Sequence, residues 1–144
     1  MTISEFKLHP QLKKDCVIIG DFDLNLVLLM NDKQYPWFIL LPKRTAMKEI
    51  HELTGTDQQQ FIKESSIFSK AIHEIFAADK INVAALGNMV PQLHIHHIVR
   101  YETDSAWPAP IWGVKPSLAY QVGEVKAIIT KLQTASIAGL VLRA

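Results

Sequence analysis

The distribution of apolar and polar residues along the chain predicts a series of short strands in its first third. Apolar runs rich in Val, Ile and Leu occupy residues 16–19 and 24–30, and a third run over 36–41 ends at Pro42. The links between these runs are too short to hold the crossover helix that parallel strands need. We therefore expect the strands to pair in an antiparallel meander.

A helical period replaces this pattern from Asp57 onward. Apolar residues and one serine recur at three- and four-residue spacing, as on one face of an α-helix. The members of this stripe are Phe61, Ser65, Phe68, Ile72, Ile75 and Phe76. Thr56 with Gln59 fits a capping box at the start of the helix. The helix is expected to reach about Ala78 and to pack its aromatic stripe on the sheet.

Two further strands and a last helix complete the expected fold. The strands cover 81–86 and 92–99, joined by a turn that contains Gly87 and Asn88. The helix follows Pro116, with Ser117 as its cap. Its expected buried stripe consists of Leu118, Val122, Val125, Ile129 and Leu132. Residues 1–144 are thus predicted to form a single α+β domain: an antiparallel sheet of about five strands with a long helix packed on it and a C-terminal helix.

Composition and charge narrow the range of partners. Hydrophobic residues make up 49% of the 144 positions and charged residues 20%, as in a globular domain with a real core. The 15 basic and 14 acidic residues create no net field that would favour nucleic acid, so local groups would have to hold a phosphate-bearing ligand. No apolar run is long enough to span a membrane, and residues 1–10 lack the pattern of a secretory signal. We therefore expect a cytoplasmic protein with no membrane association.

The candidate chemistry lies in the run from Pro91 to Arg100. On a regular strand the side chains alternate between two faces. One face would carry Gln92, His94, His96 and Ile98, and the other Leu93, Ile95, His97 and Val99. His97 is then expected to pack beneath the long helix with a hydrogen-bond partner. The same-face pair, His94 and His96, has three explanations: metal ligation, a structural role with satisfied hydrogen bonds, or nucleophilic catalysis.

Nucleophilic catalysis is the explanation that we favour for this pair. A neutral imidazole attacks phosphorus through one ring nitrogen while the other keeps its proton, and a backbone carbonyl can hold that proton in place. The neighbouring imidazole can donate to a phosphoryl oxygen or to the leaving group. Gly87 allows close backbone approach, and Asn88 offers an amide to a phosphate oxygen. A metal is not expected, because a catalytic zinc usually takes three protein ligands and the remaining histidines lack ligand spacing.

At these residues the chain resembles the histidine triad (HIT) family of nucleotide hydrolases and transferases. The family signature is His-φ-His-φ-His-φ-φ, with φ apolar, and residues 92–98 read Gln-Leu-His-Ile-His-His-Ile. The strand that ends in Pro42-Lys43 extends the resemblance, as does Gly87-Asn88, where members usually carry Gly-Gln. The resemblance covers roughly residues 15–105. Further segments are similar to a bacterial subgroup that carries Gln-φ-His-φ-His: residues 28–32, 35–37, 106–108 and 111–113.

The resemblance implies a role for each residue of the motif. His94 would be the nucleophile that forms a nucleotidyl–histidine intermediate, and His96 would hydrogen-bond the α-phosphate or the departing group. Asn88 would contact the phosphate, and Asn31 or Asp32 would lie near the ribose. Because family members are often dimeric and need no metal cofactor, a homodimer without a cofactor is expected.

Two positions depart from the family pattern. The first histidine of the triad is Gln92 here, and the histidine usual after the Pro-Lys turn is Thr45. In the family both positions support the nucleophile. Since glutamine does not titrate, a proton relay through position 92 is absent. Gln92 is nevertheless predicted to belong to the catalytic site together with His94 and His96.

The function that follows is hydrolysis or nucleotidyl transfer at the α-phosphate of a nucleotide conjugate, through covalent His94. Dinucleoside polyphosphates, nucleoside phosphoramidates and adenylated small molecules are the candidate substrates. A nucleotide-binding module without catalysis is the first alternative, supported by the missing first histidine, and a metal-dependent hydrolase is the second. Arg44 and Arg100 are interpreted as solvated surface charges. Trp107 and Trp112 fit equally a base-stacking wall, an apolar cap or a dimer interface.

Overall fold

A six-stranded sheet in the order β4-β5-β3-β2-β1-β6 forms the centre of the molecule. The structure is a computed structural model that describes residues 6–143; residues 1–5 and 144 of the predicted single domain lie outside the described residues. The strands are β1 (Cys16–Asp21), β2 (Asn25–Met30), β3 (Trp37–Pro42), β4 (Lys80–Ala84), β5 (Ile95–Arg100) and β6 (Val141–Leu142). The helices are α1 (Pro10–Asp15), α2 (Gly55–Ile75) and α3 (Glu124–Ala135), with a 3-10 turn η1 (Ile50–Glu52). All neighbouring strands are antiparallel, which confirms the predicted α+β class.

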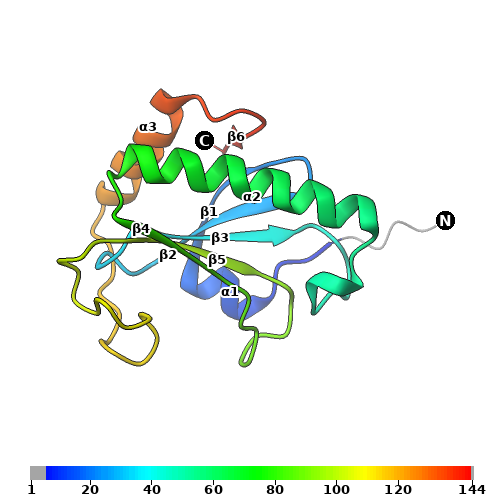
Figure 1. Cartoon of the computed structure of the whole chain (residues 1–144), viewed down its shortest axis with the longest axis horizontal. Helices are drawn as coiled ribbons and strands as arrows, with labels where there is room; N and C mark the ends of the chain where they lie inside the picture. The colour runs from blue at the N-terminus through cyan, green and yellow to red at the C-terminus, as the bar shows by residue number, and fades with distance from the viewer. Residues whose placement is uncertain (1–5, 144) are drawn as a thin grey trace.

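Helices and loops cover both faces of this sheet. α2 and α3 lie over one face, and α1 with the segment 101–116 lies over the other (Figure 1). β3 is consequently buried at all six of its positions. A strand that is buried on both faces needs apolar side chains at consecutive positions. This requirement explains why 24–30 and 36–41 are continuous apolar runs rather than alternating ones.

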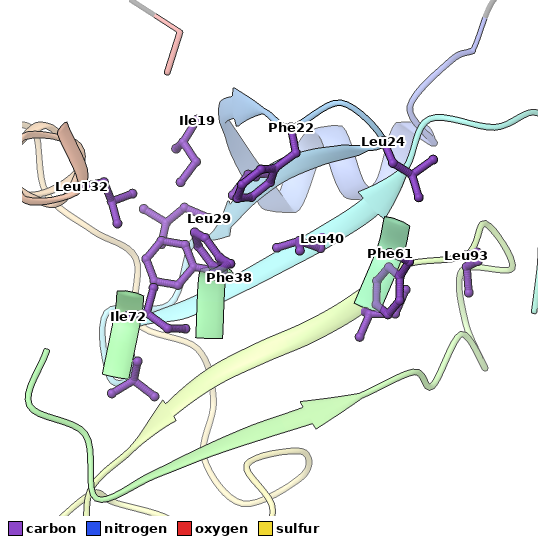
Figure 2. Close-up of a cluster of buried hydrophobic side chains, with 14 of the residues drawn as sticks. Ile19, Phe22, Leu24, Leu29, Phe38, Leu40, Phe61, Ile72, Leu93 and Leu132 are labelled. Carbon is purple, nitrogen blue, oxygen red and sulfur yellow. The ribbon is translucent and has the colours of Figure 1, made fainter. Parts of the chain in front are cut away.

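The main core lies between the sheet and α2 (Figure 2). Its aromatic rings meet edge to face, with the Phe68 ring 5.2 Å from that of Phe38 and 6.1 Å from that of Phe22. Phe61, Phe68 and Ile72 of the predicted helical stripe are buried there, so the period of the helix is confirmed. The helix does not start where the predicted capping box of Thr56 and Gln59 placed it. Thr54 is the cap and its hydroxyl accepts a hydrogen bond from the Asp57 backbone, which moves the first helical residue to Gly55.

The C-terminal helix begins later than predicted. The segment after Pro116 is held against the end of β2 instead: the Leu118 carbonyl accepts from the Lys33 backbone, and the Tyr120 backbone donates to the Asn31 side chain. α3 starts only after Gly123, which caps the helix in the left-handed conformation with a φ of 96°. The first half of the predicted stripe is therefore wrong, because Leu118 and Val122 are exposed.

Two elements were not predicted and both lie at the ends of the chain. In α1, Pro10 occupies the first helical turn and the His9 ring accepts a hydrogen bond from the Gln11 backbone. β6 is the sixth strand, where about five were expected, and it pairs with the end of β1. Gly20 makes this pairing possible, because a Cβ at that position would lie 2.7 Å from the Val141 carbonyl oxygen. Within residues 6–143, no helix combines the length and apolarity that crossing a membrane requires.

Candidate active site

His94 and His96 lie where the chain enters β5, on the sheet face opposite α2. β5 begins at Ile95, so Gln92 and His94 precede the strand instead of belonging to it. The alternation nevertheless holds for the histidines. The His94 and His96 rings lie 5.1 Å apart, whereas His97 points to α2 and its Nε2 lies 2.7 Å from the Ser65 hydroxyl. The predicted partner for His97 beneath the long helix is thus confirmed.

The backbone just before β5 determines which ring nitrogen of His94 carries a proton. Its Nδ1 lies 2.6 Å from the Gln92 carbonyl oxygen. Because a carbonyl only accepts hydrogen bonds, Nδ1 carries a proton, so in the neutral ring Nε2 holds the lone pair. The side chain is largely buried, with 6% of the residue exposed. A histidine held in this way presents a nucleophilic nitrogen without needing a side-chain base.

The tautomer of His96 is set in the opposite sense. The Trp37 indole Nε1 donates to His96 Nδ1 over 2.9 Å. Since an indole nitrogen only donates, His96 Nδ1 must hold the lone pair and Nε2 the proton. Burial, followed by the proximity of His94 and His97, lowers the pKa of His96 to about 3. His96 is therefore a neutral hydrogen-bond donor at physiological pH.

A cavity of about 310 Å³ brings the predicted residues together. His94, His96 and Asn88 line it, with Asp15 of α1 and Trp112 of the long loop. Its volume falls in the range of small-ligand sites. Asn88 sits on the turn that Gly87 opens with a positive φ of 66°, where an L side chain would be strained. Of the buried side-chain N and O atoms in the described chain, only Asn25 Oδ1 lacks a hydrogen-bond partner.

Three predicted site residues contribute differently from expectation. The Gln92 side chain accepts from the His9 backbone and donates to the Lys7 carbonyl, so it holds the N-terminal segment while its own carbonyl serves His94. The side chains of Asn31 and Asp32 accept hydrogen bonds from the backbone of the segment 118–120. Neither residue is part of the cavity lining.

Sequence reasoning missed two contributors, Asp15 and the Trp37 side chain. Asp15 reaches the cavity only because α1 folds against the sheet, and the one local signal for α1 was a proline at a helix start. Trp37 meets His96 because β3 pairs with β5 in a register that places Ile39 opposite His96. The pairing of β3 with β5 joins segments about sixty residues apart in the sequence, so no local sequence pattern predicts the contact between Trp37 and His96.

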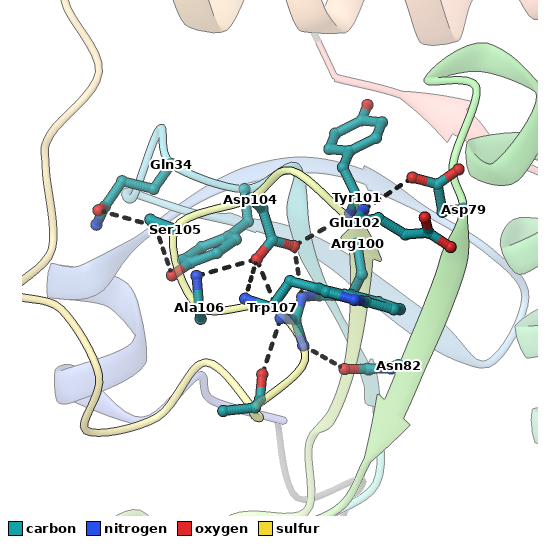
Figure 3. A network of polar contacts seen from close by, with 12 residues as sticks. Gln34, Asp79, Asn82, Arg100, Tyr101, Glu102, Asp104, Ser105, Ala106 and Trp107 are labelled. Carbon is teal, nitrogen blue, oxygen red and sulfur yellow. Dashed lines mark hydrogen bonds and ion pairs between the residues drawn. The ribbon is translucent and has the colours of Figure 1, made fainter.

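A buried ion pair between Arg100 and Asp104 lies at the end of β5 (Figure 3). It bonds to the loop that carries Trp112, whose ring centre lies 5.0 Å from that of His96. Arg100 donates from Nε and Nη2 to Asp104, and also to Asn82 and to the Ala109 carbonyl. The interpretation of Arg100 as a surface charge is wrong, because only 1% of it is exposed. Its guanidinium also lies 5.5 Å from the centre of the Trp107 ring. Trp107 and Trp112 thus have separate roles: Trp107 covers the ion pair, and Trp112 lines the cavity.

Arg44 lies at the surface as predicted, paired with Asp57 of α2 at 2.7 Å. Among the residues that the structure describes, no three side chains of His, Cys, Asp or Glu come together as a metal-binding group. The lone Cys16 is a half-buried thiol of β1, and burial raises its pKa to about 12. It is therefore unreactive, as its apolar surroundings in the sequence indicate.

Fold and site together define a small α+β protein that presents two imidazoles to one cavity, one with its proton fixed on Nδ1 and the other with its proton fixed on Nε2. Residues 11–103 match the family model of the HIT domain, and the chain belongs to that family. Histidine triad proteins of known structure are similar over nearly the whole chain. One from Marinobacter aquaeolei VT8 is 48% identical with a TM-score of 0.89, covering 92% of this chain and 96% of that one. One from Bradyrhizobium japonicum is 45% identical with a TM-score of 0.89, covering 91% and 98%.

Curated relatives are more distant. Bis(5'-adenosyl)-triphosphatase from Saccharomyces cerevisiae, in strains YJM789 and S288c among others, is 32% identical over 72 residues. The matched part is 46% of this chain and 35% of the yeast protein. The chain thus matches about a third of the length of these relatives.

Proposed function

We propose that the protein is a nucleotide hydrolase or nucleotidyl transferase that attacks the α-phosphate of a nucleotide conjugate through His94. The observation that carries the proposal is the 2.6 Å contact between His94 Nδ1 and the Gln92 carbonyl, which leaves the Nε2 lone pair on a ring that lines the cavity. Attack would form a nucleotidyl–histidine intermediate, and water would then release a nucleoside monophosphate.

The neighbouring groups have complementary roles in this proposal. His96 donates from Nε2–H to a phosphoryl oxygen or to the departing group, and Asn88 donates its amide to a phosphate oxygen. Gln92 positions the nucleophile through its backbone carbonyl. A ribose contact by Asn31 or Asp32 stays a prediction, and Asp15 offers a carboxylate that already lines the cavity.

Membership of the HIT family suggests that the ligand is a nucleotide, and the yeast relatives favour a dinucleoside polyphosphate such as diadenosine triphosphate as substrate. Nucleoside phosphoramidates are also candidate substrates, because they too offer an α-phosphate to the nucleophile. Assignment to a bacterial subgroup with Gln-φ-His-φ-His and assembly as a homodimer are further proposals that rest on the resemblance in sequence.

The decisive experiment is mass spectrometry of protein mixed with diadenosine triphosphate and quenched in alkaline denaturant, because the P–N bond of a nucleotidyl–histidine is labile in acid. A nucleotidyl adduct on His94 is expected in the wild type, and none in His94→Gly. His73→Gln, which changes an exposed histidine on α2, is the matched control and should keep full turnover. Unchanged turnover in folded His94→Gly would refute the nucleophilic role.

A binding module without catalysis is the second candidate. It is favoured by Gln92, because a non-titrating side chain with both amide ends bonded to backbone atoms cannot take part in proton transfer. Calorimetry with adenosine and guanosine monophosphates, run beside the turnover assay, separates the two candidates. Tight binding without hydrolysis of any conjugate would replace the enzyme by the binding module.

A further inference from the structure

The contact between Trp37 and His96 restricts what His96 can do. The indole Nε1–H points at His96 Nδ1 across 2.9 Å, and both residues are buried, with 9% and 4% exposed. Indole nitrogen is a donor only, so this hydrogen bond exists only while His96 Nδ1 is unprotonated. A proton added to Nδ1 would place two N–H groups opposite each other and remove the bond.

If His96 were protonated, the groups around it would offer little to replace the lost hydrogen bond from Trp37. From the loop, Trp112 packs edge-on with its ring centre 5.0 Å away. On the same face the titratable neighbour is His94, and on the opposite face it is His97. The cavity lining includes one carboxylate, that of Asp15 on α1, which already accepts a hydrogen bond from the Gln11 side chain. Burial between the indoles of Trp37 and Trp112 therefore favours the neutral form of His96, as the hydrogen bond from Trp37 does.

We propose that Trp37 is a positioning residue that holds His96 as the neutral Nε2–H tautomer throughout the reaction, so that the site favours phosphoanhydrides over phosphoramidates. The proposal rests on the function proposed above. His96 then stabilises a departing group by hydrogen bonding but keeps its proton. A phosphate leaving group can depart as an anion, whereas an amine leaving group must receive a proton.

The step balances without a proton from His96. The lone pair of His94 Nε2 forms the bond to phosphorus, and the P–O bond to the leaving phosphate breaks with its electron pair on the oxygen. His94 becomes a cationic nucleotidyl-imidazole whose Nδ1–H remains on the Gln92 carbonyl. Water then adds to phosphorus, the P–N bond returns its pair to Nε2, and the proton of the water leaves with the monophosphate product or to solvent.

The tautomer is tested by NMR of the full-length protein labelled with ¹⁵N at histidine. The wild type should show His96 with Nδ1 unprotonated and Nε2 protonated from pH 8 down to pH 5. Trp37→Phe, which keeps an aromatic ring and removes the donor, should let Nδ1 become protonated and raise the pKa of His96. Trp112→Phe is the matched control, since it changes the other indole beside His96 but leaves the hydrogen bond, and its His96 tautomer should not change.

Leaving-group preference is tested with diadenosine triphosphate and adenosine 5′-phosphoramidate, which share the nucleotidyl group. We expect kcat/KM of the wild type to be at least about a hundredfold higher for the anhydride, the scale of a missing general acid. Trp37→Phe should narrow this ratio, because His96 can then protonate an amine. Equal or faster turnover of the phosphoramidate by the wild type would overturn the proposal.

The two readouts separate failure of this proposal from failure of the proposed function. If neither conjugate is turned over, the function fails while NMR still decides the state of His96. A wild-type spectrum with Nδ1 protonated overturns the proposal whatever the activity. Because that spectrum needs no variant, the test stands even if Trp37→Phe does not fold.

Discussion

Replacing Arg100 by Met tests whether the buried ion pair anchors the loop that carries Trp112. Methionine keeps the length and apolar contact of the arginine stem against Trp107 and removes every hydrogen bond of the guanidinium. Four such bonds reach Asp104, Asn82 and the Ala109 carbonyl (Figure 3). The substitution therefore leaves a carboxylate and two oxygens without their main partner.

The expected magnitude follows from burial. The side chains of Arg100 and Asp104 are 1% and 2% exposed, so Asp104 would remain as an uncompensated charge. Breaking one partner of a buried pair costs about 3–5 kcal/mol. A domain of this size has a free energy of unfolding of roughly 5–15 kcal/mol, so the loss is a large fraction of the total. Some of it is recovered because the backbone of Tyr101, Ala106 and Trp107 still donates to Asp104.

The assay is urea denaturation followed by circular dichroism, with Arg44→Met as the matched control. Arg44 and Asp57 form the same two-pronged ion pair, with 2.7 and 3.0 Å contacts, but Arg44 is 44% exposed. The exposed pair should contribute no more than about 1 kcal/mol. Equal destabilisation by Arg100→Met and Arg44→Met would refute the reasoning that burial makes the inner pair the anchor.

Two further predictions concern the opposite face of the sheet. Because burial lowers the pKa of His97 to about 4, the unfolded chain takes up a proton first as the pH falls, so the free energy of unfolding should decrease between about pH 6.5 and 4. Urea denaturation at several pH values measures this decrease, which should be smaller in His97→Asn; an equal decrease would assign it to other groups. Glu64→Gln should cost about 1–3 kcal/mol, because the buried carboxylate accepts from the Leu24 and Asn25 backbone and an amide cannot accept at both ends. Thermal denaturation beside the exposed control Glu74→Gln checks this prediction, and equal melting temperatures would contradict it.

Much of the fold was predictable because the signals for it are local. Apolar runs joined by short links predict antiparallel pairing whatever surrounds them, and the stripe from Phe61 to Ile72 specifies a helix with one buried face. The errors arose where partners distant in sequence decide. The segment after Pro116 has a helical pattern, yet its backbone donates hydrogen bonds to Asn31 and Asp32 after the end of β2, and it forms no helix before Gly123.

The site was predictable in part for the same reason. Alternation along one strand separates His97 from the pair His94 and His96, and it holds although β5 starts only at Ile95. The contribution of Trp37 depends on the register between β3 and β5, which is set by packing on both sheet faces. Arg100 was misjudged because arginine is seldom buried, and only the return of the loop at Asp104 supplies a charge to pair with it.

Two identical side chains on one face acquire opposite chemical character through a single neighbour each. A carbonyl, which can only accept, holds the proton of His94 on Nδ1, and an indole, which can only donate, keeps the proton of His96 on Nε2. When His94 is neutral its Nε2 therefore offers a lone pair, whereas Nε2 of His96 offers an N–H. The two opposite tautomers do not require a histidine at position 92, because the Gln92 backbone carbonyl fixes the proton of His94 and Trp37 fixes that of His96. Gln92 thus lacks a titrating side chain, yet its backbone carbonyl holds the proton of His94 on Nδ1.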